Sequence, residues 1–153
     1  MPVKKLIDFL DKSRIKYVNV KHSPGYTAQE TAAAAHIPGK QMAKTVMVKI
    51  DGEMAMAVLP APYQVDFDLL KSASGGSKVE LASESEFRGI FPNCEIGAMP
   101  PFGNLWDMKV FVAKTLAEDD EIAFNAGSHT ELIKLAYKDF EKTVKPSVVK
   151  FSG

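Results

Sequence analysis

Hydrophobic residues recur along the chain with both helical and alternating spacing, which predicts a mixture of helices and strands. Residues 3–12 carry apolar side chains at helical spacing and predict a surface helix. Residues 17–20 alternate and predict a short strand, and Ser23-Pro24-Gly25 predicts a turn. A capping-box pattern that begins at Thr27 predicts a second helix, which Pro38-Gly39 ends.

The clearest local signal is a hairpin at residues 45–59, where two apolar runs flank Asp51-Gly52. This dipeptide accepts the positive φ values of a two-residue hairpin turn. The second run, residues 54–59, is apolar on both faces, which is typical of a central strand covered on both sides. We therefore expect an antiparallel pair inside the protein.

Further short elements are predicted in the second half of the chain. Residues 66–73 and 83–86 have the polar starts of helices, residues 109–112 and 121–124 predict strands separated by an acidic turn, and residues 130–136 predict a helix. A last short strand is expected within residues 144–151. Because helices and strands alternate without a strict βαβ rhythm, we expect one mixed α/β (α+β) domain over residues 1–153, with a curved mixed sheet and surrounding helices.

Composition and charge exclude several classes of protein. The 153 residues carry 19 basic and 19 acidic side chains, so no global field attracts nucleic acid or an anionic membrane. Residues 1–76 hold ten Lys and Arg against seven Asp and Glu, which leaves only a mild basic bias in that half. No apolar run approaches the ~20 residues of a membrane span, and we expect a cytoplasmic protein with no membrane contact. One cysteine, Cys94, excludes an internal disulfide and favours no metal site.

Lys44 is the first candidate for chemistry, because strand alternation puts it on the same face as Val46, Val48 and Ile50. An ammonium group on an apolar face needs water or an anionic partner. The alternative is a lysine that precedes the strand and reaches solvent. Both interpretations are compatible with the pattern.

The segment Gly97-Ala98-Met99-Pro100-Pro101-Phe102-Gly103 is the second candidate. Its glycines permit close backbone approach or positive φ, and its prolines stiffen the middle. Such a loop can present backbone groups to a ligand at low entropic cost. It matches neither the dinucleotide nor the P-loop fingerprint, and a tight structural connection remains an equal alternative.

The third candidate is Gly127-Ser128-His129, followed by a predicted helix with Ser128 as N-cap and Glu131 three residues later. Free amides at a helix start favour an anion or a developing oxyanion, and His129 would stand at that position. The alternative is a surface histidine beside an ordinary cap. No catalytic triad emerges, so an enzyme of this kind would act by positioning and electrostatics or use a group of its substrate.

In this order, the three segments resemble the YbaK and prolyl-tRNA synthetase-associated domain family of free-standing aminoacyl-tRNA deacylases. The pattern His22-Ser23-Pro24-Gly25-Tyr26-Thr27, followed by Glu30, is similar to that family as well. The resemblance implies a barrel-like sheet and an editing hydrolase that removes a wrongly attached amino acid from tRNA. It implies no cofactor and no metal, and water activation by the ribose hydroxyl of the substrate.

Site roles follow from the same resemblance. It implies catalytic roles for Lys44, Gly97 and His129, with Lys44 meeting the phosphate or ribose of the terminal adenosine. The implied substrate-binding residues are His22, Thr27, Val46, Met47, Ala98, Met99, Pro100, Phe102, Gly103, Gly127 and Ser128. Pocket size would sort amino acids mainly by excluding larger side chains.

Two other functions stay open from the sequence. A binding module could hold an aminoacyl or nucleotide-like ligand without turnover, and a different hydrolase could use Cys94 or Ser128 as nucleophile. The expected partner is the acceptor end of mischarged tRNA, with a synthetase or an elongation factor as possible helpers. A monomer is the default expectation.

Overall fold

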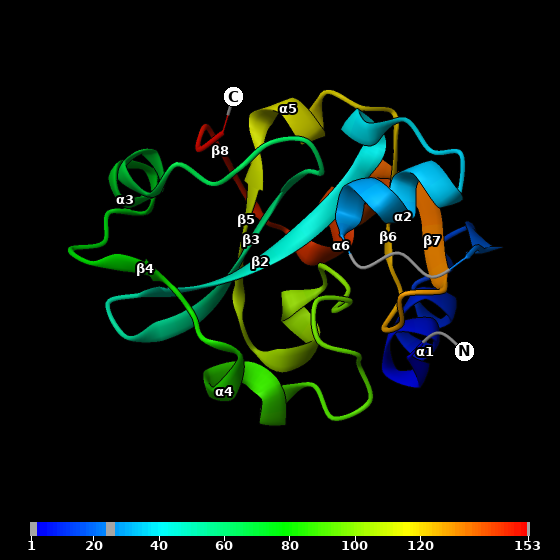
Figure 1. The fold of residues 1–153 in the computed structure, drawn as a ribbon, viewed down its shortest axis with the longest axis horizontal. Coiled ribbons are helices and arrows are strands. Elements are labelled where there is room, and N and C mark those ends of the chain that lie inside the picture. Colours follow the sequence, from blue (N-terminus) through cyan, green and yellow to red (C-terminus); the bar gives the residue numbers. More distant parts are fainter. Residues whose placement is uncertain (1–2, 24–26, 153) are drawn as a thin grey trace.

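A mixed eight-stranded sheet runs through the protein in the computed structural model, which describes residues 3–23 and 27–152 (Figure 1). The strands are β1 (Tyr17–Lys21), β2 (Met42–Ile50), β3 (Glu53–Pro60), β4 (Val79–Leu81), β5 (Lys109–Ala113), β6 (Glu121–Asn125), β7 (Glu131–Ala136) and β8 (Ser147–Val149). The α-helices are α1 (Lys4–Lys12), α2 (Ala28–Ala34), α3 (Phe67–Ser74), α4 (Glu84–Phe87), α5 (Lys114–Ala117) and α6 (Tyr137–Val144). Short 3-10 helices occupy Gly39–Gln41, Arg88–Ile90 and Gly103–Trp106.

The predicted mixed α/β fold and its hairpin are confirmed. The strand order is β1-β7-β6-β2-β3-β5-β8, with parallel pairs at β2/β6, β3/β5 and β5/β8 and antiparallel pairs elsewhere. Asp51 and Gly52 join β2 to β3 with φ of +51° and +84°, as a tight hairpin turn requires. The predicted turn at Ser23-Pro24-Gly25 extends outside the described residues.

One edge of β2 is shared by two short partners, and this arrangement matters for the site. β6 pairs only with Met42 and Ala43 at one end, and β4 pairs only with Val48 to Ile50 at the other. Residues 44–47 between them pair with β3 alone among the described strands. The middle of β2 therefore has backbone that no neighbouring strand covers on that side.

Apolar side chains pack in three clusters on the two faces of the sheet. The main cluster lies on the face that includes Met47 and is closed by α1 and α6. The other face carries an α2 cluster (Ala32, Met42, Ala61, Ala123, Leu132) and an α3 cluster (Val48, Ala55, Ala57, Leu59, Leu70, Phe111, Ala113, Phe151). Lys44 lies on this second face of the sheet. Along β2 it stands between Met42 of the α2 cluster and Val48 of the α3 cluster.

Residues 131–136 form a strand, so the helix predicted there is wrong. β7 pairs with β1 on one side and β6 on the other, and its residues Glu131, Leu132, Ile133 and Leu135 are buried. A central position between two strands provides backbone partners and apolar contact that outweigh a local helix signal. The capping box predicted at Ser128 and Glu131 therefore does not cap a helix.

Three smaller differences concern elements that the patterns did not predict. Helix α5 occupies the connection between β5 and β6, where only an acidic turn was expected. Helix α6 follows β7, and β4 lies ahead of α4. Two predicted N-caps are confirmed, at Thr27, which accepts from the Glu30 amide at 3.0 Å, and at Ser83, which forms a capping box with Glu86. No helix within the described ranges is long and apolar enough to span a membrane.

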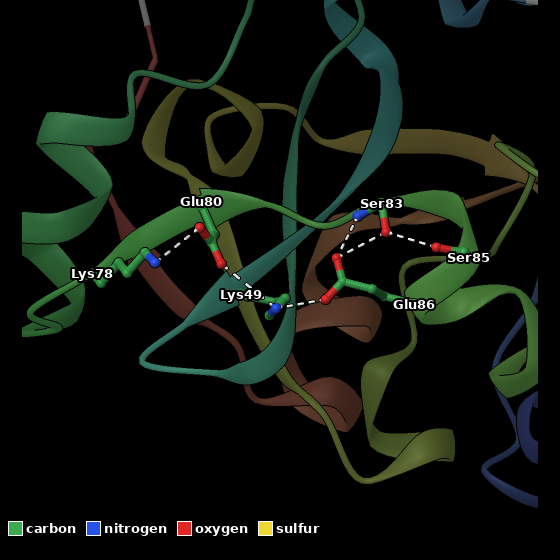
Figure 2. A network of polar contacts seen from close by, with 6 residues as sticks. All are labelled: Lys49, Lys78, Glu80, Ser83, Ser85 and Glu86. Atoms are coloured by element: carbon green, nitrogen blue, oxygen red, sulfur yellow. Dashed lines mark hydrogen bonds and ion pairs between the residues drawn. The ribbon is translucent and has the colours of Figure 1, made fainter.

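A charged network joins β2, β4 and α4 (Figure 2). Lys49 contacts Glu86 and lies 3.5 Å from Glu80, and Glu80 lies 3.5 Å from Lys78. Glu86 also accepts hydrogen bonds from the amide and hydroxyl of Ser83, each at 2.9 Å. Because Lys49 and Ser83 both stabilise the ionised form, the pKa of Glu86 falls to about 2.

This network gives a pH-dependent stability. A pKa held below its unfolded value adds stability above about pH 4.5, and that contribution is lost as pH falls towards 2. We expect the wild type to exceed Glu86→Gln in urea stability at pH 6 and the difference to vanish by about pH 2. Urea unfolding between pH 6 and pH 2 measures this, with Glu84→Gln as control because Glu84 only meets Arg88 at 4.0 Å. A difference that stays constant across the range would contradict the assignment.

Candidate functional site

Two segments that are distant in sequence hydrogen-bond to each other and form the centre of the candidate site. The amide of Glu95 donates to the Gly127 carbonyl at 2.8 Å, and the amide of Gly127 donates to the Ala98 carbonyl at 2.9 Å. The turn between them closes with the Ala98 amide donating to the Glu95 carbonyl at 3.0 Å. The predicted mid-chain loop and the segment before β7 therefore lie side by side.

Gly97 is the point where this loop meets His129. Its φ of +85° lies in the left-handed region, which side-chain-bearing residues rarely adopt. A Cβ at this position would lie 3.6 Å from Cε1 of His129. Gly97 is exposed, whereas the residues that follow it are buried. Glycine thus leaves backbone accessible beside the imidazole.

The His129 ring is fixed by a backbone acceptor. Its Nε2 lies 2.8 Å from the Ile96 carbonyl oxygen, and a carbonyl can only accept, so Nε2 carries a hydrogen. The side chain is 15% exposed. The segment that holds His129 is a loop between strands, so no helix start contributes to its environment.

Glu95 supports His129 and was not among the predicted residues. Its Oε2 accepts from the His129 amide at 3.1 Å and lies 3.9 Å from His129 Nε2. The carboxylate is about half exposed, at 55%. No short motif marks such a residue, because its role depends on two loops that meet only in the fold.

Gly127 also requires glycine, for a different reason. Its φ is +105°, and a Cβ there would lie 2.2 Å from Cγ2 of Val3. The Val3 amide donates to the Ala126 carbonyl at 2.9 Å. The start of α1 therefore holds the loop that carries His129.

Lys44 lies near this loop through the sheet register. The β2/β6 pairing ends at Ala43 and Phe124, so the next residues along the two strands are Lys44 and Asn125. Beyond Asn125 the chain enters the loop of Gly127 and His129. All three predicted segments thus reach the same end of β6 or the loop behind it.

Lys44 is half-buried, and burial lowers the pKa of its ammonium. Within residues 3–23 and 27–152 the side-chain ammonium forms no hydrogen bond or ion pair. A cation that is partly removed from water without a counter-ion favours an anionic group beside it. The predicted facing of Lys44, Val46 and Val48 is confirmed, but the main core packs on the opposite face.

Several predicted substrate-binding residues lie in the interior. Ala98, Met99, Pro100, Phe102 and Gly103 are buried, and Met99 and Phe102 belong to the main cluster. Phe102 is fully buried and contacts the rings of Phe9, Phe124 and Phe140 at centroid distances of 5.9, 5.3 and 5.3 Å. Because these three rings surround it in the interior, Phe102 supports the loop from beneath.

The remaining predicted substrate-binding residues lie on different faces of the sheet or have structural roles. Val46 is half-buried on the face of Lys44, whereas Met47 is buried in the main cluster on the other face. Thr27 caps α2. Ser128 lies half-buried next to His129, with its Oγ 3.3 Å from Thr130 Oγ1. Met47 and Val46 therefore cannot line the same pocket.

Neither alternative nucleophile gains support from its surroundings. Burial raises the pKa of the Cys94 thiol to about 11, so the reactive thiolate is scarce at neutral pH. The hydroxyl of Ser128 meets Thr130. Among the described residues, no three His, Cys, Asp or Glu side chains form a group that could hold a metal ion. Independence from metal stays a prediction.

Comparison with known sequences places these residues in a wider context. The profile of the aminoacyl-tRNA editing domain matches residues 22–143. The multifunctional Ser/Thr-tRNA deacylase ProXp-y of Escherichia coli strain K12 is 34% identical over 116 residues, which cover 72% of this chain and 69% of that protein. A proline–tRNA ligase of Bacillus cytotoxicus is 32% identical over 89 residues, 58% of this chain and 16% of the ligase.

Solved structures share the fold at low sequence identity. A crystal structure of a candidate trans-editing enzyme for prolyl-tRNA synthetase superposes with a TM-score of 0.82 and 18% identity, covering 98% of this chain and 96% of the other. A crystal structure of a hypothetical protein gives a TM-score of 0.87 at 18% identity, with coverage of 98% and 100%. The whole arrangement of helices and strands is therefore common to these proteins.

Proposed function

This chain belongs to the aminoacyl-tRNA editing domain family, and we propose from that premise that it hydrolyses the ester bond of mischarged aminoacyl-tRNA. The observation that carries the proposal is the junction of Gly97 and His129, with Lys44 near the same end of β6. An aminoacyl ester presents a carbonyl, a ribose and a nearby phosphate. The site offers exposed loop backbone, an imidazole held in place by its Nε2 hydrogen bond to Ile96, and an uncompensated ammonium to match them.

Each group has a proposed part in ester hydrolysis. Lys44 binds the phosphate or ribose of the terminal adenosine, since an anion relieves the cost of its partial burial. The backbone around Gly97 stabilises the negative charge that develops on the carbonyl oxygen of the ester during hydrolysis. His129 orients this ester group. Cys94 is disfavoured as an internal nucleophile, and we assign water activation to the ribose hydroxyl of the substrate.

A panel of mischarged tRNAs tests this function. Serine and threonine esters come first, because the Escherichia coli relative is a Ser/Thr-tRNA deacylase. We expect the purified protein to accelerate loss of at least one noncognate ester over its spontaneous hydrolysis. Binding of the acceptor end without any acceleration would instead favour the alternative, a module that holds an aminoacyl or nucleotide-like ligand.

We further propose that the tRNA acceptor end is the partner, that the protein acts in the cytoplasm, and that it works as a monomer. The balanced charge, 19 basic against 19 acidic residues, supports local contact with few phosphates. Weak contact of this kind suits delivery of the substrate by a synthetase or an elongation factor. The domain is proposed to span residues 1–153.

Substitutions at Glu95 test whether its hydrogen bond to the His129 amide contributes to deacylation. Glu95→Ala removes the acceptor of the His129 amide, and we expect deacylation to fall about tenfold, the value of one charge-assisted hydrogen bond. Glu95→Gln keeps an oxygen acceptor and should retain most activity. Single-turnover deacylation of both variants at pH 7 measures the difference. Equal rates for Glu95→Ala and wild type would show that this contact has no part in the reaction.

A further inference from the structure

Asn125, at the end of β6, has a buried polar atom that the fold does not satisfy. The residue is 8% exposed, and its Oδ1 has no hydrogen-bond partner in the described part of the structure. A buried acceptor left unpaired destabilises the folded protein, because it has given up its hydrogen bonds to water without a replacement. A donor from outside the chain, either a water molecule or a ligand hydroxyl, can satisfy this acceptor.

The sheet register puts Asn125 on the face that carries Lys44. Met42 pairs with Ala123 and Ala43 pairs with Phe124, so alternation directs Lys44 and Asn125 to the side of Met42 and Ala123. Asn125 also pairs with Leu132 of the α2 cluster, which lies on this side. A cation and an unpaired acceptor are therefore neighbours where β2 and β6 separate.

His22 adds a second unpaired acceptor to the same face. Its Nδ1 lies 2.7 Å from the Ser23 carbonyl oxygen, so Nδ1 carries the hydrogen and Nε2 is a bare acceptor in the neutral ring. Nε2 is buried and has no partner among the residues the structure describes. Val20, which pairs with Leu132, lies two residues earlier and thus shares the face with His22.

We infer that Asn125 accepts a hydrogen bond from a hydroxyl of the substrate's terminal ribose, with His22 available to a second hydroxyl; this inference rests on the proposed function. A hydroxyl fits better than the amino acid's ammonium group, because Lys44 would repel a second cation nearby. A hydroxyl can also accept from Lys44 while it donates to Asn125. Asn125 is then a substrate-binding residue on the ribose side of the ester.

The experiment measures the binding of two ligands, which differ by one ribose hydroxyl, to the wild type and to Asn125→Leu. The ligand is an RNA minihelix that ends in CCA and carries serine on its last nucleotide through a nonhydrolysable amide, with and without the neighbouring ribose hydroxyl. We expect removal of the hydroxyl to weaken binding to wild type about tenfold. Asn125→Leu should bind the intact ligand about tenfold more weakly and show no further loss when the hydroxyl is removed. Equal losses in both proteins would overturn the inference.

Stability provides a second readout that a purely structural asparagine would not give. Replacing an unpaired buried amide with an apolar side chain of similar size should leave the unfolding midpoint unchanged or raise it. A large drop would show that Asn125 holds the fold, against our inference. Asn125→Ala repeats the binding test if the leucine does not fit. Asn19→Leu makes the same substitution at an exposed position of β1 and is the control.

The same ligands separate this inference from the proposed function. Hydroxyl-dependent binding that the Asn125→Leu variant loses, without hydrolysis of the matching ester by the wild type, would support the role of Asn125 and reject the deacylase. Hydrolysis with an Asn125→Leu variant that keeps full affinity and rate would support the deacylase and reject the role of Asn125.

Discussion

Replacing Lys44 with methionine is expected to lower deacylation about a hundredfold or more while the protein stays folded. The proposed ammonium contact with phosphate or ribose acts in a partly desolvated place, where losing one charged partner of a reacting group costs about that factor. Methionine keeps the length of the side chain on β2 and removes only the charge. The rate of loss of a mischarged ester under single-turnover conditions measures the effect.

The matched control for this variant is Lys109→Met. Lys109 is an exposed lysine at the start of β5, so its replacement removes the same charge away from β2 and the two loops. We expect its deacylation rate to equal that of wild type. If Lys44→Met were as active as Lys109→Met, the proposed mechanism would be wrong. If both lost activity alike, net charge and not position would explain the loss.

Replacing Phe102 with alanine is expected to reduce the free energy of unfolding by about 3–5 kcal/mol. The ring is fully buried and lies among Phe9, Phe124 and Phe140, so truncation leaves a cavity that these neighbours fill only in part. For a chain of this size the thermal midpoint should fall by about 10 °C. Urea unfolding followed by circular dichroism gives the free energy directly.

Phe67→Ala is the comparison for this loss, because Phe67 is only half-buried at the start of α3. It should lose less than half as much stability. A conservative Phe102→Leu variant should keep the choice of amino acid unchanged in the deacylation panel. A change of preference with little loss of stability would return Phe102 to the pocket wall that the sequence first suggested.

Local signals explain the parts of the fold that the sequence could predict. Asp51-Gly52 specifies a hairpin by backbone geometry alone, and Thr27 and Ser83 specify helix starts by nearby hydrogen bonds. Residues 131–136 were mispredicted because strands distant in sequence supply their partners. Helix α6 was predictable in principle, since Tyr137, Phe140 and Val144 are buried at helical spacing.

The residues of the candidate site also divide into those with a local sequence signal and those whose position depends on distant segments. Alternation along β2 predicts the face of Lys44. The glycines of the Gly97–Gly103 segment permit a positive φ, which Gly97 adopts. Glu95 and Asn125 have no such signal, because one depends on two loops meeting and the other on the register of two strands. The full burial of Phe102 could not be predicted, because the Gly97–Gly103 segment does not tell which of its side chains point inward.

Val3 has a practical consequence for anyone who expresses this protein. Its amide bonds to Ala126, and its side chain fills the space that Gly127 leaves open, so the first described residue braces the loop that carries His129. An affinity tag ahead of Val3 is therefore attached close to the reaction centre. In Figure 1, α1 and β8 lie on opposite sides of the molecule, and the Phe151 carbonyl accepts a hydrogen bond from the amide of Asp66, the N-cap of α3. A tag ahead of Val3 should therefore be removed before deacylation rates are measured.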